Sequence, residues 1–148
     1  MFTLNKKVVR EKNLIVIKEF SNSNKSKLRY LGLPSDEMED IICWKEYIKH
    51  ISAVERGIKG QEHIRQHNIY LKSFNLGLNN IITLYRGDID DILINGHDET
   101  QKLSYPYDLV NLDYTGGFIY KELGDSSKRI DSIKKLFNEF MRQQEFIK

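Results

Sequence analysis

Short apolar segments rich in β-branched residues alternate along this chain with segments whose apolar residues recur at helical spacing. The strand-like segments are residues 28–32, 51–55, 81–86 and 108–113. Helices are expected over residues 36–49, 61–76 and 89–93, and from 126 to the end. Because neighbouring parallel strands need a crossover connection, which is usually a helix, this alternation predicts a parallel sheet with helices on both faces.

The 148 residues correspond in length to one ordinary domain. Residues 1–26 are interpreted as an N-terminal extension, in which the pattern leaves helix and strand both open, and residues 27–148 as a single α/β domain. Ser35 is the expected N-cap of the first helix of that domain. The spacing predicts one buried face for each long helix: Ile64, His67, Leu71, Phe74 and Leu78 in the middle helix, and Ile130, Ile133, Phe137, Phe140 and Met141 in the last.

Composition narrows the class of protein. The chain has 23 basic and 21 acidic residues, so its net charge of +2 permits nucleic-acid binding without arguing for it. No apolar run approaches the roughly 20 residues of a membrane-spanning helix, and the first residues lack a signal-peptide pattern, so a cytoplasmic location is expected. The single Cys43 is interpreted as a core residue. Neither a Gly-x-Ser-x-Gly elbow nor a phosphate-binding loop occurs, which disfavours hydrolases and P-loop proteins.

Polar or turn residues follow each expected strand: Gly32, Glu55, Asp88 and Asp113. The carboxyl ends of parallel strands share one rim of the sheet, where ligands bind in open α/β folds. A carboxylate at Glu55 could accept hydrogen bonds from ribose hydroxyls, and one at Asp88 from an exocyclic amine. A glycine at position 32 could let a ligand approach the backbone. The alternatives are a turn acid with an exposed ion pair for Glu55, a helix cap for Asp88 and a plain turn at Gly32.

The order and spacing of these residues resemble class I methyltransferases that use S-adenosylmethionine. The matching segments are Leu31-Gly32-Leu33-Pro34, Val54-Glu55-Arg56-Gly57, Arg86-Gly87-Asp88-Ile89 and Asn111-Leu112-Asp113-Tyr114. The resemblance implies that S-adenosylmethionine is the cofactor. Glu55 would then bind its ribose hydroxyls, Asp88 would lie near its adenine, and Gly32 with Pro34 would lie by its methionine part.

The fourth segment, from Asn111 to Tyr114, is similar to the motif of methyltransferases that act on amino groups of nucleobases. In that family an acid or amide orients the attacking nitrogen and an aromatic ring stacks on the base. The resemblance therefore implies that Asn111 and Asp113 hold the methyl acceptor, a nucleobase or nucleic acid, and that Tyr114 stacks on it.

The same resemblance implies a Rossmann-like three-layer αβα sandwich with about four strands in the order 3-2-1-4. The family has seven strands, so the chain corresponds to the front half of that fold. The strand from Asp108 to Asp113 would then lie at an apolar sheet edge. Since proteins rarely leave such an edge bare, we expect a second copy or an additional chain to cover it.

Another class of function remains open. The chain has the single Gly32 where the family has three closely spaced glycines, and it lacks the remaining strands. Both departures favour a non-catalytic domain of the same fold that binds a partner protein or nucleic acid. A dinucleotide oxidoreductase is disfavoured because the Gly-x-Gly-x-x-Gly fingerprint is absent. His63 and His67 have a metal-binding spacing on one helix, but a packing role is commoner there.

Overall fold

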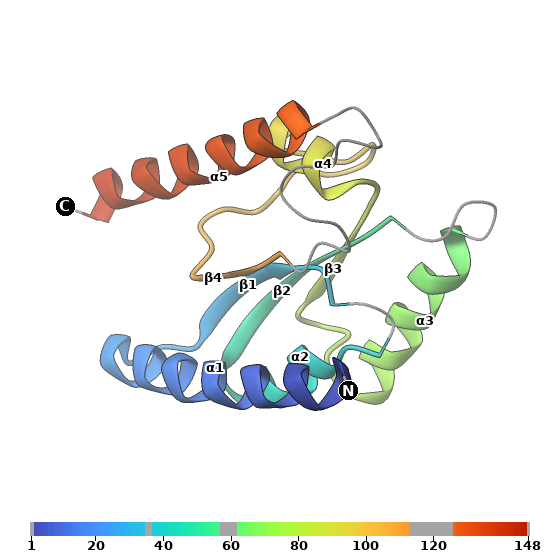
Figure 1. The fold of residues 1–148 in the computed structure, drawn as a ribbon, viewed down its shortest axis with the longest axis vertical. Helices are drawn as coiled ribbons and strands as arrows, with labels where there is room; N and C mark the ends of the chain where they lie inside the picture. Colours follow the sequence, from blue (N-terminus) through green and yellow to red (C-terminus); the bar gives the residue numbers. More distant parts are fainter. Residues whose placement is uncertain (1, 35–36, 57–61, 113–125, 148) are drawn as a thin grey trace.

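A computed structural model shows a four-stranded sheet between two layers of helices (Figure 1). It describes residues 2–34, 37–56, 62–112 and 126–147. The elements in chain order are α1 (Phe2–Asn24), β1 (Leu28–Gly32), α2 (Glu39–Trp44), a 3₁₀ turn η1 (Lys45–Tyr47), β2 (Ile48–Glu55), α3 (Glu62–Asn75), β3 (Ile82–Arg86), α4 (Ile89–Asn95), β4 (Leu109–Asn111) and α5 (Ser126–Ile147). The N-terminal segment, which the sequence left open between helix and strand, is a helix.

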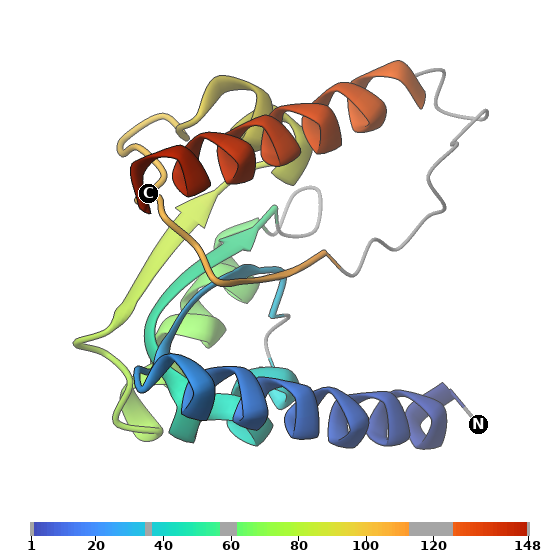
Figure 2. The same ribbon diagram turned by 90° about the vertical axis from the view of Figure 1, so that its left-hand side faces the viewer.

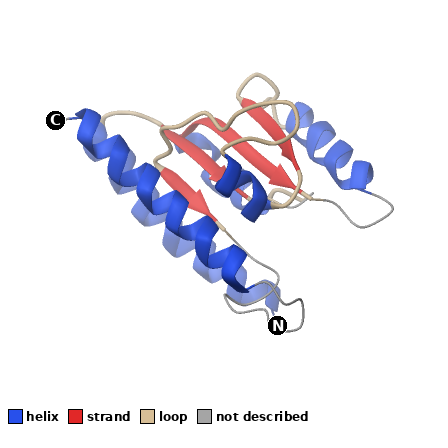
Figure 3. Cartoon of the chain, turned by 90° about the horizontal axis from the view of Figure 1, so that it is seen from above, coloured by secondary structure: helices blue, strands red, loops and turns tan. Residues whose placement is uncertain are grey.

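The sheet has the strand order β3-β2-β1-β4, and every pair is parallel (Figure 3). This confirms the predicted fold class, a Rossmann-like α/β sandwich. In the register, Gly32 at the end of β1 lies between Ala53 of β2 and Asn111 of β4. Glu55 and Arg86 end β2 and β3 side by side. The carboxyl ends of all four strands therefore meet along one rim.

Each face of the sheet has its own apolar core, and α1 and α5 lie on opposite sides (Figure 2). The first core, under α1, α2 and α3, contains Ile17, Leu28, Tyr30, Met38, Ile41, Trp44, Ile48, Ile51, Ala53, Ile69 and Leu78. The second core, under α4 and α5, contains Leu31, Val54, Tyr85, Ile89, Ile92, Leu93, Leu103, Tyr107 and Leu136. The consecutive residues Tyr30 and Leu31 lie in different cores, as expected for a strand whose side chains alternate between two buried faces.

Side-chain hydrogen bonds hold the segment before β4 against β1. The guanidinium of Arg29 donates to the carbonyl oxygens of Pro106 (2.8 Å) and Ser104 (2.7 Å). The backbone N–H of Arg29 donates to the Asp108 carboxylate at 2.9 Å. On the buried side, the Tyr107 hydroxyl donates to Ser52 Oγ at 2.8 Å. These contacts align the short β4 with β1, although only three residues of β4 pair.

The predicted helix over 36–49 is shorter than expected, and β2 starts earlier. Residues 35–36 lie outside the described part, so the predicted cap at Ser35 is not seen there. The N-cap of α2 is the buried Met38, with φ 54° and no side-chain cap. At the other end Ile48 is the β-sheet partner of Leu28 and is almost fully buried. Pairing with β1 therefore ends the helical segment despite its continuous apolar pattern.

The predicted buried face of α3 is wrong. Of the five residues, only Leu78, which follows the helix, is buried; Leu71 and Phe74 are 48% and 63% exposed. The buried side is Gln66, Ile69 and Ser73. These polar side chains have partners: Gln66 donates to the Glu55 carbonyl oxygen at 3.0 Å and Ser73 to that of Ile69 at 2.7 Å. Because their hydrogen bonds are satisfied, burying this face costs little.

The predicted face of α5 is also largely wrong. Ile130, Phe137 and Met141 are exposed, whereas Leu136 and Ser132 are buried. The cause lies in α4. Asp90 is buried there, and it accepts a hydrogen bond from the Ser132 hydroxyl at 2.6 Å and faces Arg129 at 3.4 Å. A buried carboxylate needs such partners, so α5 is rotated to supply them.

No helix in the described ranges is long and apolar enough to span a membrane.

Candidate functional site

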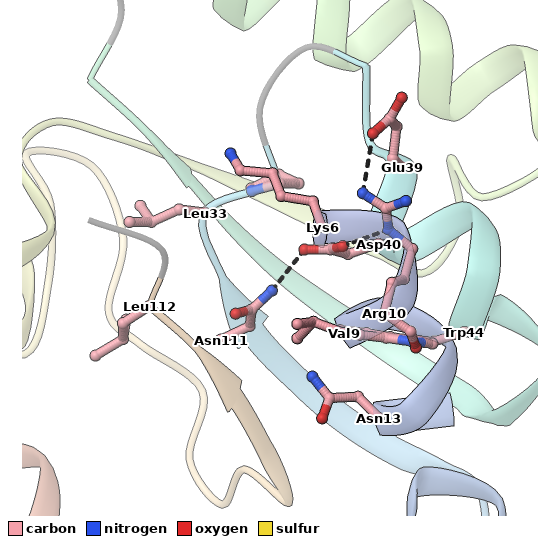
Figure 4. Close-up of a pocket in the computed structure, with 11 residues that line it drawn as sticks. Lys6, Val9, Arg10, Asn13, Leu33, Glu39, Asp40, Trp44, Asn111 and Leu112 are labelled. Atoms are coloured by element: carbon pink, nitrogen blue, oxygen red, sulfur yellow. Dashed lines mark hydrogen bonds and ion pairs between the residues drawn. The ribbon is translucent and has the colours of Figure 1, made fainter. Parts of the chain in front are cut away.

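A pocket of about 400 Å³ opens at the carboxyl ends of β1 and β4 (Figure 4). Its walls are the N-terminal half of α1, the turn after β1, the start of α2 and the end of β4. Its lining residues include Lys6, Arg10, Pro34, Asp40, Trp44 and Asn111. The volume lies within the range of about 300–1,000 Å³ typical of small-molecule sites. The pocket therefore brings two sequence-predicted residues, Pro34 and Asn111, together on the predicted rim.

Four hydrogen-bonded side chains line one part of this pocket. Asn111 Nδ2 donates to Asp40 Oδ2 at 2.8 Å, and Arg10 Nε donates to Asp40 Oδ1 at 2.7 Å. Arg10 Nη2 donates to Glu39 Oε2 at 2.9 Å. The hydrogen bond from Arg10 to Asp40, partly opposed by burial, raises the pKa of the guanidinium, so Arg10 stays charged at any working pH. A cation on α1 is thus connected through a carboxylate on α2 to the amide at the end of β4.

Packing explains why residue 32 is a glycine, because other atoms already fill the space that a side chain would take. A Cβ at this position would lie 2.4 Å from the Tyr30 hydroxyl oxygen and 2.7 Å from the Asn111 carbonyl oxygen. The Leu33 N–H donates to that same carbonyl at 3.2 Å. The sequence predicted that a ligand would approach the backbone of Gly32. In the structure, the Tyr30 side chain and the neighbouring strand β4 approach it. Its predicted contact with a cofactor stays a prediction.

Glu55 is buried at the end of β2, with about 9% of its surface exposed. Its Oε1 lies 3.6 Å from Arg65 Nε of α3, so Glu55 has an ion pair, but at a buried strand position and not in the exposed turn of the alternative. Its carbonyl oxygen accepts hydrogen bonds from Gln66 and from the N–H of Gly87. Its predicted contact with ribose hydroxyls stays a prediction.

Asp88 caps α4. Its Oδ1 accepts from the N–H groups of Asp90 (2.8 Å) and Asp91 (3.3 Å), and Arg56 and Lys128 lie within 4 Å of its carboxylate. This is the capping alternative that the sequence offered. The cap uses Oδ1, whereas Oδ2 lies 3.7 Å from the exposed Arg56. The predicted role of Asp88 near an adenine stays a prediction.

Asp113 and Tyr114, two of the three predicted acceptor residues, lie outside the described residues. The sequence also missed part of the site: Lys6, Arg10, Asp40 and Trp44. Asp40 and Trp44 are four residues apart on one short helix, so their common direction was available as a signal. Lys6 and Arg10 have the same spacing in α1, but nothing in the sequence places α1 beside β4.

The described ranges contain no group of three or more His, Cys, Asp or Glu side chains arranged to hold a metal ion. His63 and His67 lie on the exposed side of α3. Cys43 is half-buried against the first core, and burial raises the pKa of its thiol, as in a packing residue.

Comparison with protein-family models, with curated proteins and with solved structures finds no match to this chain. Its function is therefore argued from the fold and the rim of the sheet.

Proposed function

We propose that this chain is a methyltransferase-like domain that binds S-adenosylmethionine and directs its methyl group to a nitrogen of a nucleobase or similar acceptor. The observation that carries the proposal is the rim itself. Four parallel strands in the order β3-β2-β1-β4 bring a carboxylate at the end of β2 (Glu55), a carboxylate just beyond β3 (Asp88) and an amide at the end of β4 (Asn111) to one rim, and of these three Asn111 lines the pocket. The resemblance to class I methyltransferases assigns the first two groups to the cofactor and the amide to the methyl acceptor.

The residues fit the cofactor in three respects. The Glu55 carboxylate at the end of β2 is an acceptor of the kind that vicinal hydroxyls need. Asp88 offers a carboxylate oxygen for an exocyclic amine while its other oxygen caps α4. Leu33 and Pro34 give the pocket an apolar wall. The cofactor supplies an electrophilic methyl group, and the protein would contribute proximity and orientation of the accepting nitrogen.

Isothermal titration calorimetry with S-adenosylmethionine and its demethylated product tests this directly. We expect a dissociation constant within about 1 μM to 1 mM. Glu55→Gln removes the charge at nearly constant volume and should weaken binding by about tenfold or more, because hydrogen bonds to charged groups contribute roughly 1.5–3 kcal/mol. Glu46→Gln, at an exposed position of η1, is the matched control. Circular dichroism confirms that each variant is folded.

A second function, that of a non-catalytic binding domain, is favoured by a specific observation. The space at Gly32 is filled, Glu55 has an ion pair, Asp88 has a cap and the Asn111 amide N–H₂ has a carboxylate. In this alternative the rim is internally satisfied and needs no cofactor. Absence of heat when S-adenosylmethionine is titrated into wild-type protein, or equal affinity of wild type and Glu55→Gln, would support the non-catalytic binding domain.

A further inference from the structure

A second cavity lies on the opposite side of the sheet from α1. It has a volume of about 650 Å³ and opens between α5 and the yellow-to-orange segment that joins α4 to β4 (Figure 2). The Gln143 amide links these two walls, because Nε2 donates to the Tyr107 carbonyl oxygen at 3.4 Å and Oε1 accepts from the Tyr107 N–H at 3.3 Å. Among the described residues, none lines both this cavity and the pocket at the rim.

The inner walls of this second cavity are apolar. Leu93 of α4 is fully buried, and Leu103 is almost so. The Tyr105 ring packs edge-on against the ring of Tyr107, with the two centroids 5.0 Å apart. Tyr107 is itself held by the hydrogen bond from its hydroxyl to Ser52, so the aromatic wall is fixed in place. A cavity of this size with such walls suits the apolar body of a small molecule.

The charged side chains around the cavity are mostly basic. Among the described residues that line it, Lys102, Lys135 and Arg142 are basic and Glu139 alone is acidic. Glu139 Oε1 lies 3.8 Å from Lys135 Nζ and 3.9 Å from Arg142 Nη1, which is too far for a hydrogen bond to either. Both basic side chains are exposed, so they stand at the mouth. An excess of one charge around a cavity attracts a ligand of the opposite charge.

The Tyr105 hydroxyl adds a donor to this cavity. It is buried, and no described residue forms a hydrogen bond with it, although buried hydroxyls almost always have a partner. Burial, and to a lesser extent the charge of Glu139, raises the pKa of this phenol, so it stays protonated and can donate. Neighbouring side chains cover the hydroxyl, so a ligand reaches it when one of the exposed side chains at the mouth turns aside.

We infer that this cavity binds a small amphipathic anion, with its apolar body against Leu93, Leu103 and Tyr105 and its carboxylate or phosphate group at the basic mouth. Three cations and a phenol donor all favour an acceptor on the ligand. Glu139 opposes them by repulsion, and thereby lowers the affinity for the anion. This inference goes beyond the proposed function and does not depend on it, because the cavity lies apart from the rim of the sheet.

The test compares 2-naphthoate, 2-naphthyl phosphate and the uncharged 2-naphthamide, which share one apolar ring system. Each is titrated into the ¹⁵N-labelled full chain and followed by NMR, which gives the affinity and locates the residues that are perturbed. We expect both anions to bind about threefold or more tightly than the amide. This preference should shrink between about 20 mM and 0.5 M sodium chloride, because salt screens charges at the mouth. The tighter of the two anions identifies the preferred charged group.

Four variants test the roles of the lining residues. Lys135→Gln should weaken 2-naphthoate about two- to fivefold and leave 2-naphthamide unchanged. Lys134→Gln is the matched control, because this exposed neighbour in α5 does not line the cavity. Glu139→Gln should tighten 2-naphthoate by removing the repulsion. Tyr105→Phe removes a hydroxyl that has no partner among the described residues, so it should weaken 2-naphthoate about two- to tenfold and leave the fold intact.

Three results would overturn the inference: equal affinity for the anions and 2-naphthamide, weaker binding of 2-naphthoate to Glu139→Gln, or equal effects of Lys134→Gln and Lys135→Gln. The NMR spectra also separate the two sites. Binding in the second cavity should shift the backbone signals of Leu103 and Tyr105. Shifts confined to Asn111 and other residues of the rim pocket, which also contains the cations Lys6 and Arg10, would contradict the assignment.

Discussion

Gly32→Ala distinguishes two explanations of the glycine at the end of β1. If Gly32 only gives a ligand access to the backbone, the added methyl group should weaken binding and leave stability nearly unchanged. In the structure, however, the methyl carbon would lie 2.4 Å and 2.6 Å from Tyr30 Oη and Cζ and 2.7 Å from the Asn111 carbonyl oxygen. Distances below 3 Å require atoms to move. We therefore expect Gly32→Ala to destabilise the fold itself.

The expected loss of stability depends on whether the atoms around Gly32 can move. β1 is an inner strand, paired with β2 on one side and β4 on the other, so its backbone cannot shift freely. The Tyr30 ring is fully buried in the first core. Overpacking of such a site typically costs about 1–3 kcal/mol. For a chain of this size each kcal/mol lowers the melting temperature by roughly 2–4 °C, so the expected decrease is about 2–12 °C.

Urea unfolding of a double-mutant cycle with Tyr30→Phe is the assay. Removing the hydroxyl relieves the shortest of the three contacts, so Gly32→Ala should cost less in the Tyr30→Phe background, with a coupling of about 0.5–3 kcal/mol. Gly96→Ala is the control. Nothing lies within 4 Å of a Cβ at Gly96, but its φ is +80°, so its cost comes from the backbone and should not depend on Tyr30.

The reasoning is refuted if Gly32→Ala unfolds within about 0.5 kcal/mol of wild type, which is the range of neutral surface substitutions. A variant of normal stability that no longer binds S-adenosylmethionine would instead support the ligand-access explanation. Equal costs of Gly32→Ala in both backgrounds would show that Tyr30 is not the obstacle.

Three further predictions concern the cap of α4, an acidic turn and the sheet edge. Asp88→Ala should lower the free energy of unfolding by about 0.5–2 kcal/mol through loss of the cap, whereas Asp88→Asn should retain most of it; urea unfolding measures both. Burial raises the pKa of Asp98, but the N–H groups of Arg86, Thr100 and Gln101 outweigh it and lower the pKa overall. Its stabilisation is therefore complete above the unfolded-state pKa of about 3.9 and is lost as the pH falls through the lower folded-state value. Thermal unfolding of Asp98→Asn should show a weaker loss of stability below pH 4 than wild type, and parallel curves would contradict this. Finally, a partner over the outer edge of β4 predicts a solution mass near twice the 17.5 kDa of one chain by light scattering, and a monomer would count against a second copy there.

The accuracy of the sequence-based predictions differs between local and non-local features. The predicted strand at Leu28–Gly32 matches β1, and all four predicted strands and the helices between them exist. The parallel order also follows, because a strand, a helix and the next strand form a unit whose connection has a preferred hand. The buried faces of α3 and α5 could not be predicted in this way. Hydrophobic spacing assumes that the apolar stripe is the packed one. Gln66 and Ser132, however, are buried with hydrogen-bond partners from other elements, and Ser73 is buried with a partner in its own helix.

The sequence by itself therefore determined the element order, the parallel sheet and the positions of Gly32, Glu55 and Asp88 at or just beyond the carboxyl ends of their strands. Asp113, which the sequence places at the end of the fourth strand, lies outside the described residues. Those features depend on local periodicity and on the geometry of crossovers. Only the tertiary structure decided what surrounds each of these positions. Arg10 and Asp40 are 30 residues apart in the chain, and Asp40 and Asn111 are 71 apart. Packing of α1 and α2 on one face of the sheet brings the three side chains into hydrogen-bond contact, and no local pattern encodes that arrangement.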